Sequence, residues 1–357
     1  MNKKIISVVV LVVVVILGVW SLQNRTVGGK ETVKIGVVAP VTGAAAAYGT
    51  TLVKGIEMAL ADVSETSTKY TYQVVVEDDA STPAKSTTAT QKLINVDGVK
   101  AIITVTSGSG NAVKPIAEKA GIVHICDCND VTIGNVAYNF TNLILPPDEV
   151  KTWLDEAQKR GNKTIAILAQ THPGFTILVN NLLQQVEARG MSVVFNESFN
   201  ADNRDFKTMV AKAKSKKPDI YLIGAFPPSL DIATKELKDN GIQNISTMGV
   251  FTTSPNPSLY NGLWFTDSTL TDLALKERFV KLYPDIRFNA RTVPYGYDIF
   301  NMLVQSFEKG GDLFANVKAI TEYNGKVGKV TKDLNSQNFR SSASIWTMVN
   351  GVPEMVR

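Results

Sequence analysis

Cysteine and histidine are scarce in this chain, with two of each among 357 residues. Both cysteines and one histidine lie in one stretch, HICDCND at residues 124–130, while His172 stands alone. In an extended strand His124, Cys126 and Cys128 share one face, but residues two apart are about 6.5–7 Å apart at Cα. That Cα–Cα distance is long for two thiolates that bind the same metal ion, and it lies at or beyond the upper limit for a disulfide. We therefore favour buried free thiols over a metal centre or a disulfide, and predict no metal site.

Clusters of charge are also missing. The 37 basic and 33 acidic residues leave a net charge of only +4, and no basic cluster stands out. So little excess charge on so long a chain argues against a nucleic-acid partner. There is no G-x-S-x-G motif and no paired acidic motif, and His172 precedes Pro173 in a predicted loop, so hydrolase chemistry has no support. We predict no enzymatic activity and no cofactor.

In the first 22 residues the charged side chains are those of Lys3 and Lys4. Lys3 and Lys4 precede an apolar run over residues 5–22, which is long enough to span a bilayer. No Ala-x-Ala cleavage site follows, and no cysteine is available for a lipid anchor. We predict that residues 1–22 form a membrane anchor or signal segment, with an uncleaved anchor favoured, and that 23–32 are a flexible linker. The remaining chain then lies on the periplasmic or cell-surface side of the cytoplasmic membrane.

What the chain does have is a regular alternation of apolar stretches and amphipathic helical patterns. Its length and its 44% hydrophobic content indicate a folded protein of two domains. The predicted strands are 33–40, 72–79, 101–106 and 122–126 in a first series, and 164–170, 191–195, 219–225 and 245–251 in a second. Runs of valine and isoleucine without polar alternation are typical of parallel strands covered on both faces. We therefore predict two α/β lobes, which meet near residues 143–149.

A glycine-containing stretch, TSGSGNAV at residues 106–113, partly matches a dinucleotide-binding motif. It lies between a predicted strand and a predicted helix, and Asp127 follows about 20 residues on, where a ribose-binding acid would stand. Against this, Val113 replaces the third glycine, and the motif lies in the third unit of the series. The hydroxyls of Ser107 and Ser109 at a helix N-terminus still predict a site for an anionic group such as a carboxylate.

Several longer stretches resemble a known family. VKIGVVAPVTGAAAAYGTTLVKGIEMALADV, VVVEDDASTPAKSTTATQKLI, GVKAIITVTSGSGNAVKPIAEKAGIVHI, DFKTMVAKAKSKKPDIYLIGAF and PYGYDIFNML occur in this order. Together they resemble the branched-chain amino-acid type of extracellular solute-binding protein, the receptor component of ABC importers. The resemblance covers about residues 33–350 and does not identify the ligand.

The resemblance implies a type I periplasmic-binding-protein fold, in which two α/β lobes close on a ligand. Three hinge crossovers are expected near residues 145–149, 266–270 and 330–334. The first lobe then comprises residues 33–146 and 268–331, and the second comprises residues 147–267 and 332–357.

The resemblance also implies site residues. Amino-acid-binding members hold the ligand carboxylate with a serine and a threonine of the first lobe, and its ammonium with a glutamate of the second. Aligned here, these positions are Ser107, Asp130 and Phe251. A carboxylate at position 130 would repel a ligand carboxylate 4 Å away by about 4 kcal/mol. Either Asp130 binds the ammonium instead, or the ligand is another small compound, such as an amine, an amide or an aromatic acid. The predicted ligand-binding residues are Ser107, Gly108, Ser109, Cys128, Asp130, Tyr48, Phe175, Phe226 and Phe251.

The predicted protein is thus a monomeric, membrane-tethered receptor whose closed form is recognised by an ABC permease with its ATPase. Two alternatives are a ligand-sensing module of the same fold, coupled to a signalling partner, and an NAD-linked enzyme.

Overall fold

The computed structural model describes residues 29–43, 45–67, 69–248 and 254–356. The predicted anchor, residues 1–22, and Phe251 lie outside the described residues. Residues 31–32 belong to the first strand and not to the predicted linker. Within the described ranges, no helix combines the length and the apolar character needed to span a membrane.

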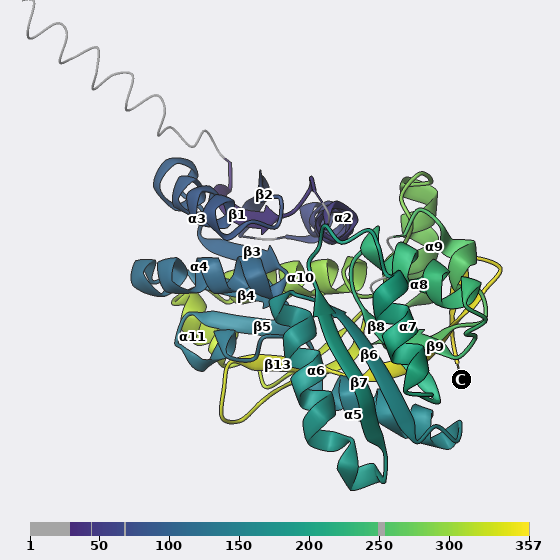
Figure 1. The fold of residues 1–357 in the computed structure, drawn as a ribbon. Coiled ribbons are helices and arrows are strands. Elements are labelled where there is room, and N and C mark those ends of the chain that lie inside the picture. The colour runs from purple at the N-terminus through teal and green to yellow at the C-terminus, as the bar shows by residue number, and fades with distance from the viewer. Residues whose placement is uncertain (1–28, 44, 68, 249–253, 357) are drawn as a thin grey trace, which may run out of the picture.

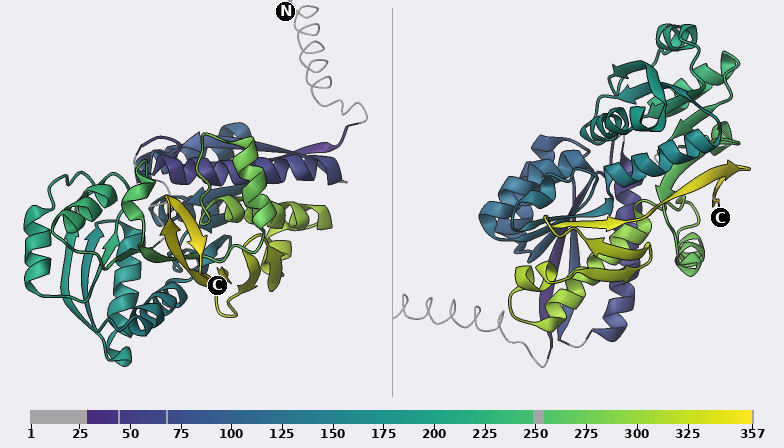
Figure 2. Two further views of the ribbon diagram at one scale, coloured as in Figure 1. Left: turned by 90° about the vertical axis from the view of Figure 1, so that its right-hand side faces the viewer. Right: turned by 90° about the horizontal axis from the view of Figure 1, so that it is seen from below.

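Two α/β lobes lie side by side, as Figures 1 and 2 show, and the predicted architecture is confirmed. The sheet of the first lobe has the strand order β11-β12-β13-β5-β4-β3-β1-β2. Its strands are β1 (Glu31–Ala39), β2 (Tyr70–Asp78), β3 (Ala101–Val105), β4 (Val123–Asp127), β5 (Asn139–Ile144), β11 (Glu322–Gly325), β12 (Gly328–Lys332) and β13 (Asn338–Ser341). The strands from β13 to β2 run parallel, whereas β12 and β11 pair in antiparallel fashion.

The sheet of the second lobe repeats this plan, in the order β15-β14-β10-β9-β8-β6-β7. Its strands are β6 (Thr164–Gln170), β7 (Ser192–Phe199), β8 (Ile220–Gly224), β9 (Ile245–Thr247), β10 (Trp264–Ser268), β14 (Ala343–Val349) and β15 (Val352–Met355). Strands β7 to β10 are parallel, and β14 and β15 add an antiparallel edge.

Helices cover both faces of each sheet, which explains why the central strands β3, β4 and β5 are buried along their whole length. In the first lobe α2 (Ala46–Thr66) and α10 (Val293–Lys309) cover one face, and α3 (Pro83–Lys92) and α4 (Ser107–Ala120) the other. In the second lobe α5 (Pro146–Lys159) and α6 (Pro173–Gln185) lie opposite α7 (Lys207–Ser215) and α8 (Ser229–Asp239). Helix α9 (Leu273–Leu282) is bonded to α2 through Arg278 and Asp62, and α11 (Leu313–Lys318) follows α10.

Helices α2 and α10 approach each other closely because glycines lie at their contact. A Cβ atom on Gly55 would come within 2.1 Å of the carbonyl oxygen of Val293, and one on Gly296 within 2.4 Å of that of Leu52. No larger residue fits at either position without moving the helices apart.

The chain passes between the lobes three times. The first passage, at Leu145, joins β5 to α5, and the second, at residues 269–272, joins β10 to α9. Both lie near the crossovers expected from the sequence. The third passage is at Ser342, between β13 in the first sheet and β14 in the second. In Figure 2 the yellow C-terminal strands lie where the two lobes meet.

The third crossover differs from the expected position at residues 330–334. Strand β13 pairs in parallel with β5, where Asn338 lies opposite Thr141. Residues 332–341 therefore remain with the first lobe, although the family resemblance implied that they belong to the second. The reason is that β13, with the sequence NFRS, is short and largely polar, so it carries no apolar run that marks it as a strand.

Candidate ligand-binding site

A small cavity of about 50 Å³ lies between the lobes, at the carboxyl ends of β3 and β4 on one side and of β6 and β8 on the other. Ligands bind at this edge in open α/β sheets. The first lobe contributes Tyr48, Thr106, Ser107, Asp127, Cys128, Asn129, Leu143 and Arg291, and the second contributes His172, Gly174, Phe175, Leu178, Phe226 and Met248. The space is smaller than the roughly 300–1,000 Å³ of most small-molecule clefts, so the lobes are drawn closely together.

Aromatic rings form one wall of this cavity. The ring of Phe226 contacts those of Tyr48, Phe175 and His172, with centroid distances of 6.0, 5.0 and 5.2 Å. Tyr48 belongs to α2 of the first lobe, whereas the other rings belong to the second. One hydrophobic cluster therefore continues from lobe to lobe through these side chains. The structure brings the predicted residues Tyr48, Phe175 and Phe226 together here.

Ser107, the predicted carboxylate contact, also lines the cavity, and it is linked to a residue that the sequence did not suggest. Its hydroxyl donates to Oδ1 of Asn129 over 2.8 Å, and Nδ2 of Asn129 donates to the carbonyl of Gly174 over 3.2 Å. Gly174 lies in the first turn of α6 in the second lobe, so Asn129 bonds the two lobes directly across the site. No local sequence pattern indicates that Asn129, rather than Cys128 or Asp130, bonds the second lobe.

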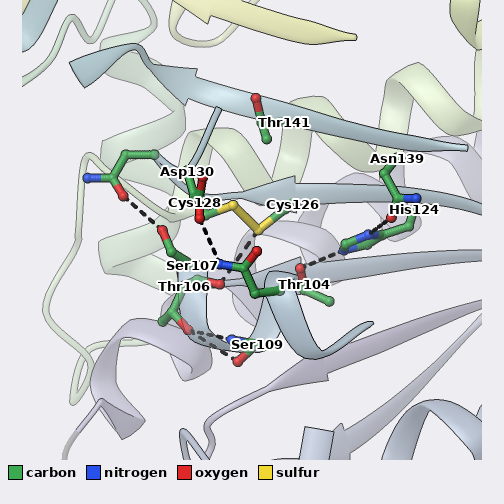
Figure 3. The surroundings of a disulfide bond; sticks show 12 residues. Thr104, Thr106, Ser107, Ser109, His124, Cys126, Cys128, Asp130, Asn139 and Thr141 are labelled. Atoms are coloured by element: carbon green, nitrogen blue, oxygen red, sulfur yellow. Dashed lines mark hydrogen bonds between the residues drawn. A yellow bond between two sulfur atoms is a disulfide. The ribbon is translucent and has the colours of Figure 1, made fainter. Parts of the chain in front are cut away.

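Gly108 and Ser109 follow Ser107 at the start of α4 and were also predicted to bind the ligand. Thr106, with a φ of 74°, caps α4, and its Oγ1 accepts from the backbone N–H of Ser109 over 3.4 Å (Figure 3). The hydroxyl of Ser109 donates to the buried carboxylate of Asp79. A Cβ atom on Gly108 would meet nothing nearer than Oγ1 of Thr106, at 4.0 Å. Neither Gly108 nor Ser109 lines the cavity.

Asp130 is likewise not brought to the cavity, contrary to the sequence-based expectation. Its Oδ1 accepts from the backbone N–H and the hydroxyl of Thr132, over 3.0 and 2.6 Å, and its Oδ2 accepts from Nδ2 of Asn111 over 2.7 Å. These bonds close the turn that follows β4. Asp130 is therefore a turn residue beside the site (Figure 3).

Asp127 is the acidic residue that does line the cavity. It ends β4 and is 2% exposed, and neither carboxylate oxygen has a hydrogen-bond partner. Burial raises the pKa of Asp127 well above its usual range; the nearby Arg291 opposes this rise and Asp267 adds to it. Strand alternation places Asp127 on the opposite face to Cys126.

Arg291 lines the cavity and is bonded to two buried acids outside the lining. Its Nη1 donates to Oε2 of Glu149 over 3.1 Å, its Nη2 also bonds that carboxylate, and its Nε donates to Oδ1 of Asp267 over 3.2 Å. All three side chains are at most 4% exposed. Burial raises the pKa of Asp267 to about 6, although Arg291 lowers it. Glu149 follows the first crossover and Asp267 precedes the second, while Arg291 precedes α10 of the first lobe. The ion pairs of Arg291 therefore connect these two crossovers to the first lobe.

His172 supplies a hydrogen-bond donor from the second lobe. Its Nδ1 accepts from the backbone N–H of Gly174 over 3.2 Å and caps α6. That bond requires an unprotonated Nδ1, so Nε2 carries the proton. Burial lowers the pKa of His172 to about 4, and the imidazole is therefore neutral at pH 7. Sequence reasoning treated His172 as an isolated loop residue, because its proximity to the first lobe is purely tertiary.

Comparison with known proteins agrees with this geometry. The model of the periplasmic binding protein family matches residues 32–343. The chain belongs to the periplasmic binding protein family. One relative, the leucine-, isoleucine-, valine-, threonine- and alanine-binding protein of Pseudomonas aeruginosa, is 26% identical over 59% of this chain and 58% of its own length. The match therefore spans less than two thirds of that relative. A second, the Leu/Ile/Val-binding protein BraC3 of Rhizobium johnstonii, is 24% identical over 86% of this chain and 90% of its own length.

Solved structures of other periplasmic binding proteins share the type I fold. The branched-chain amino acid transporter substrate-binding protein LivJ of Streptococcus pneumoniae, in complex with isoleucine, has a TM-score of 0.82 at 20% identity and covers 91% of this chain and 99% of its own. A solute-binding protein of an ABC transporter from Rhodopseudomonas palustris, in complex with 3,4-dihydroxybenzoic acid, has a TM-score of 0.80 at 19% identity, over 91% and 96%.

The two cysteines of this periplasmic binding protein form a disulfide, so the prediction of free thiols is wrong. Strand β4 ends at Asp127 and the chain turns there, which shortens the Cα–Cα distance between Cys126 and Cys128 to 5.3 Å. That distance lies within the disulfide range, unlike the spacing of an extended strand. Cys128, predicted as a ligand contact, lines the cavity.

His124 is not a metal ligand but part of a buried hydrogen-bond chain (Figure 3). Its ring nitrogens bond to Oδ1 of Asn139 over 2.7 Å and to the hydroxyl of Thr104 over 2.8 Å. Burial lowers the pKa of His124 to about 4, so the ring is neutral at pH 7. Among the described residues of this periplasmic binding protein, no three His, Cys, Asp or Glu side chains are placed to hold a metal ion.

Proposed function

We propose that this periplasmic binding protein is an extracytoplasmic receptor of an ABC importer, which binds an amino acid or a related small polar or aromatic compound between its lobes. The observation that carries the proposal is the interlobe cavity, which has polar groups from both lobes and a wall of aromatic rings. A few placed polar groups within an apolar lining are typical of small-molecule sites. The relatives named for binding branched-chain amino acids, and the neighbours bound to isoleucine and an aromatic acid, support the same class of ligand.

The site residues suggest how such a ligand is held. The hydroxyl of Ser107 can turn from Asn129 to a ligand carboxylate, and the first turn of α4 directs backbone N–H groups to the same place. The neutral imidazole of His172 offers Nε2–H from the second lobe, and the rings around Phe226 cover the apolar part of the ligand. A ligand that contacts both lobes favours the closed form, which a permease and its ATPase then recognise.

The remaining features of the proposal follow the same scheme. The receptor acts as a monomer, is exported, is tethered to the membrane by residues 5–22, and performs no chemistry on its ligand. An NAD-linked enzyme is disfavoured because a cavity of about 50 Å³ is far too small for a dinucleotide, and because Asp127 is buried at its floor.

Thermal unfolding of the purified full chain tests the proposal. Aliphatic and aromatic amino acids, small amines, benzoate-type acids and NAD are added one at a time. A ligand present at 100 times its dissociation constant stabilises the folded state by about 2.7 kcal/mol, which raises the unfolding temperature measurably. We expect a rise with at least one amino acid or aromatic acid and none with NAD. A panel without any response, or a response to NAD alone, would contradict the proposal.

Two serines of α4 provide a matched pair of variants. Ser107→Ala removes the hydroxyl inside the cavity, and we expect about tenfold weaker binding of a carboxylate ligand, as measured by calorimetry. Ser109→Ala removes a hydroxyl that bonds Asp79 outside the cavity, so it should lower the unfolding temperature and leave affinity unchanged. Equal affinity losses in both variants would argue against the proposed carboxylate position.

A further inference from the structure

Building on the proposed function, we propose that Asp127 is the residue that selects the solute: it binds a cationic amino group of the ligand from the floor of the first lobe, and it releases a proton when it does so. Asp130 is bonded within its own turn to Asn111 and Thr132 and does not line the cavity. Asp127 is thus the carboxylate that the described part of the cavity lining offers to a ligand.

The geometry of Asp127 carries this inference. Its backbone is held by the N–H of Thr106, which donates to the Asp127 carbonyl over 3.2 Å at the end of β4. Its side chain is 2% exposed and borders the cavity, yet both carboxylate oxygens lack a hydrogen-bond partner. Buried polar atoms in folded proteins are nearly always bonded, so an orphaned carboxyl beside a cavity indicates a ligand group that completes it.

The charged groups that face Asp127 are of both signs. From the elements packed around it come the titratable side chains of Tyr48, Tyr295, Asp267 and Arg291. The guanidinium of Arg291 is already bonded to Asp267 and to Glu149, two carboxylates for one positive charge.

That pairing leaves Asp127 as the carboxyl of the described cavity lining that has no bonded partner. An ammonium at hydrogen-bond distance gains attraction from the ionised Asp127, whereas a ligand carboxylate at the same place meets repulsion from it. The carboxylate of an amino acid is accordingly expected at the other end of the cavity, near Ser107 and the first turn of α4.

Proton release follows from the burial of Asp127. Burial raises the pKa of Asp127 well above its usual range; Arg291 opposes this rise and Asp267 adds to it, so the protonated carboxyl is favoured before a ligand cation binds. An ammonium at hydrogen-bond distance favours the ionised form, and the proton leaves to solvent. By linkage, affinity for an amino ligand increases with pH as long as unbound Asp127 remains protonated.

Calorimetry on the full chain with matched ligands tests this inference. The probes are leucine and phenylalanine, each compared with the acid that lacks only the amino group, 4-methylpentanoate and 3-phenylpropanoate. For whichever pair binds, we expect the acid without the amino group to bind at least about 30-fold more weakly. Titrations at pH 7 in two buffers of different ionisation enthalpy should show release of about one proton with the amino ligand.

Two isosteric variants complete the test. Asp127→Asn should abolish both the preference for the amino ligand and the proton release, while Asp130→Asn, three positions away and outside the cavity, should retain both. Circular dichroism melting shows whether each variant folds, and the proton count of the wild-type chain tests the inference even if Asp127→Asn does not fold.

The possible failures are distinct. Amino ligands that bind without proton release, or equally well to Asp127→Asn, would overturn the role of Asp127 and leave the proposed function standing. Tighter binding of the acids without the amino group would have the same effect. If no probe of the panel binds at all, the proposed function fails and this inference fails with it.

Discussion

Replacing Arg291 by methionine should destabilise the protein strongly, because Arg291 neutralises two buried acids at the hinge. Its guanidinium bonds Glu149 and Asp267, whose side chains are 0% and 1% exposed. Removing one partner of a buried ion pair costs about 3–5 kcal/mol, since the remaining charge has neither water nor a counter-ion. At about 2–4 °C per kcal/mol, the unfolding temperature should fall by roughly 6–20 °C.

The destabilisation should depend on pH in a definite direction. In the wild-type protein burial raises the pKa of Asp267 to about 6, so the folded state keeps this proton at pH values where the unfolded state has lost it. The corresponding stabilisation is complete below about pH 4 and is lost as the pH rises through 6. In Arg291→Met the pKa of Asp267 rises further, because Arg291 lowers it in the wild-type protein. The variant should therefore be closest to wild type near pH 5 and most destabilised near pH 8.

Urea unfolding of both proteins at pH 5 and pH 8 provides the measurement. Arg278→Met is the matched control: Arg278 pairs with Asp62 over 2.7 Å, but their side chains are 40% and 37% exposed. An exposed pair contributes about 0–1 kcal/mol, so this variant should remain near wild type at both pH values. A loss in Arg291→Met no larger than that of the control, or the same at both pH values, would refute the reasoning.

Three further predictions concern packing, the turn after β4 and acid stability. Gly55→Ala should destabilise by about 1–3 kcal/mol or more in urea unfolding, because its Cβ would lie 2.1 Å from the carbonyl oxygen of Val293; Gly108→Ala, whose Cβ has no neighbour nearer than 4.0 Å, should be tolerated. Asp130→Ala should destabilise the protein by about 0.5–1.5 kcal/mol for each hydrogen bond lost but keep its ligand affinity in calorimetry. A large loss of affinity would indicate instead that Asp130 contacts the ligand. Because burial lowers the pKa of His124 to about 4, its neutral state contributes about 3 kcal/mol above pH 6.5 that is lost as the pH falls to 4. The free energy of unfolding, measured at pH 6.5 and at pH 4, should change less with pH in His124→Gln than in the wild-type protein. An equal change in both proteins would contradict the assigned role of neutral His124.

The predictable part of the fold rested on local patterns. The strands β1, β3, β6 and β8 are predominantly apolar, and their predicted positions differ from the observed ones by two residues or fewer at either end. Such runs identify strands because both faces of a parallel sheet must be buried. Strands with polar residues were missed: β13 contains NFRS and β10 contains WFTDS, and both are buried by partners that are distant in sequence.

The candidate site was only partly predictable for a related reason. The family resemblance indicated Tyr48, Phe175 and Phe226, which it aligns with aromatic positions in the wall of the binding site. The sequence did not indicate which residue after β4 faces the cavity, since the turn at Asp127 ends the alternation of side chains. The same turn brings Cys126 and Cys128 close enough for a disulfide.

The amino-acid sequence by itself determined the two α/β lobes and the family resemblance, because the periodic burial of apolar residues is a local property. Only the tertiary structure decided that Asp127 lines the cavity while Asp130 closes a turn, that Asn129 bonds the second lobe, and that Arg291 joins the acids of the hinge. Asn129 bonds a residue 45 positions away, and Arg291 bonds one 142 positions away. The geometry of these bonds depends on how the lobes pack, and no local pattern encodes it.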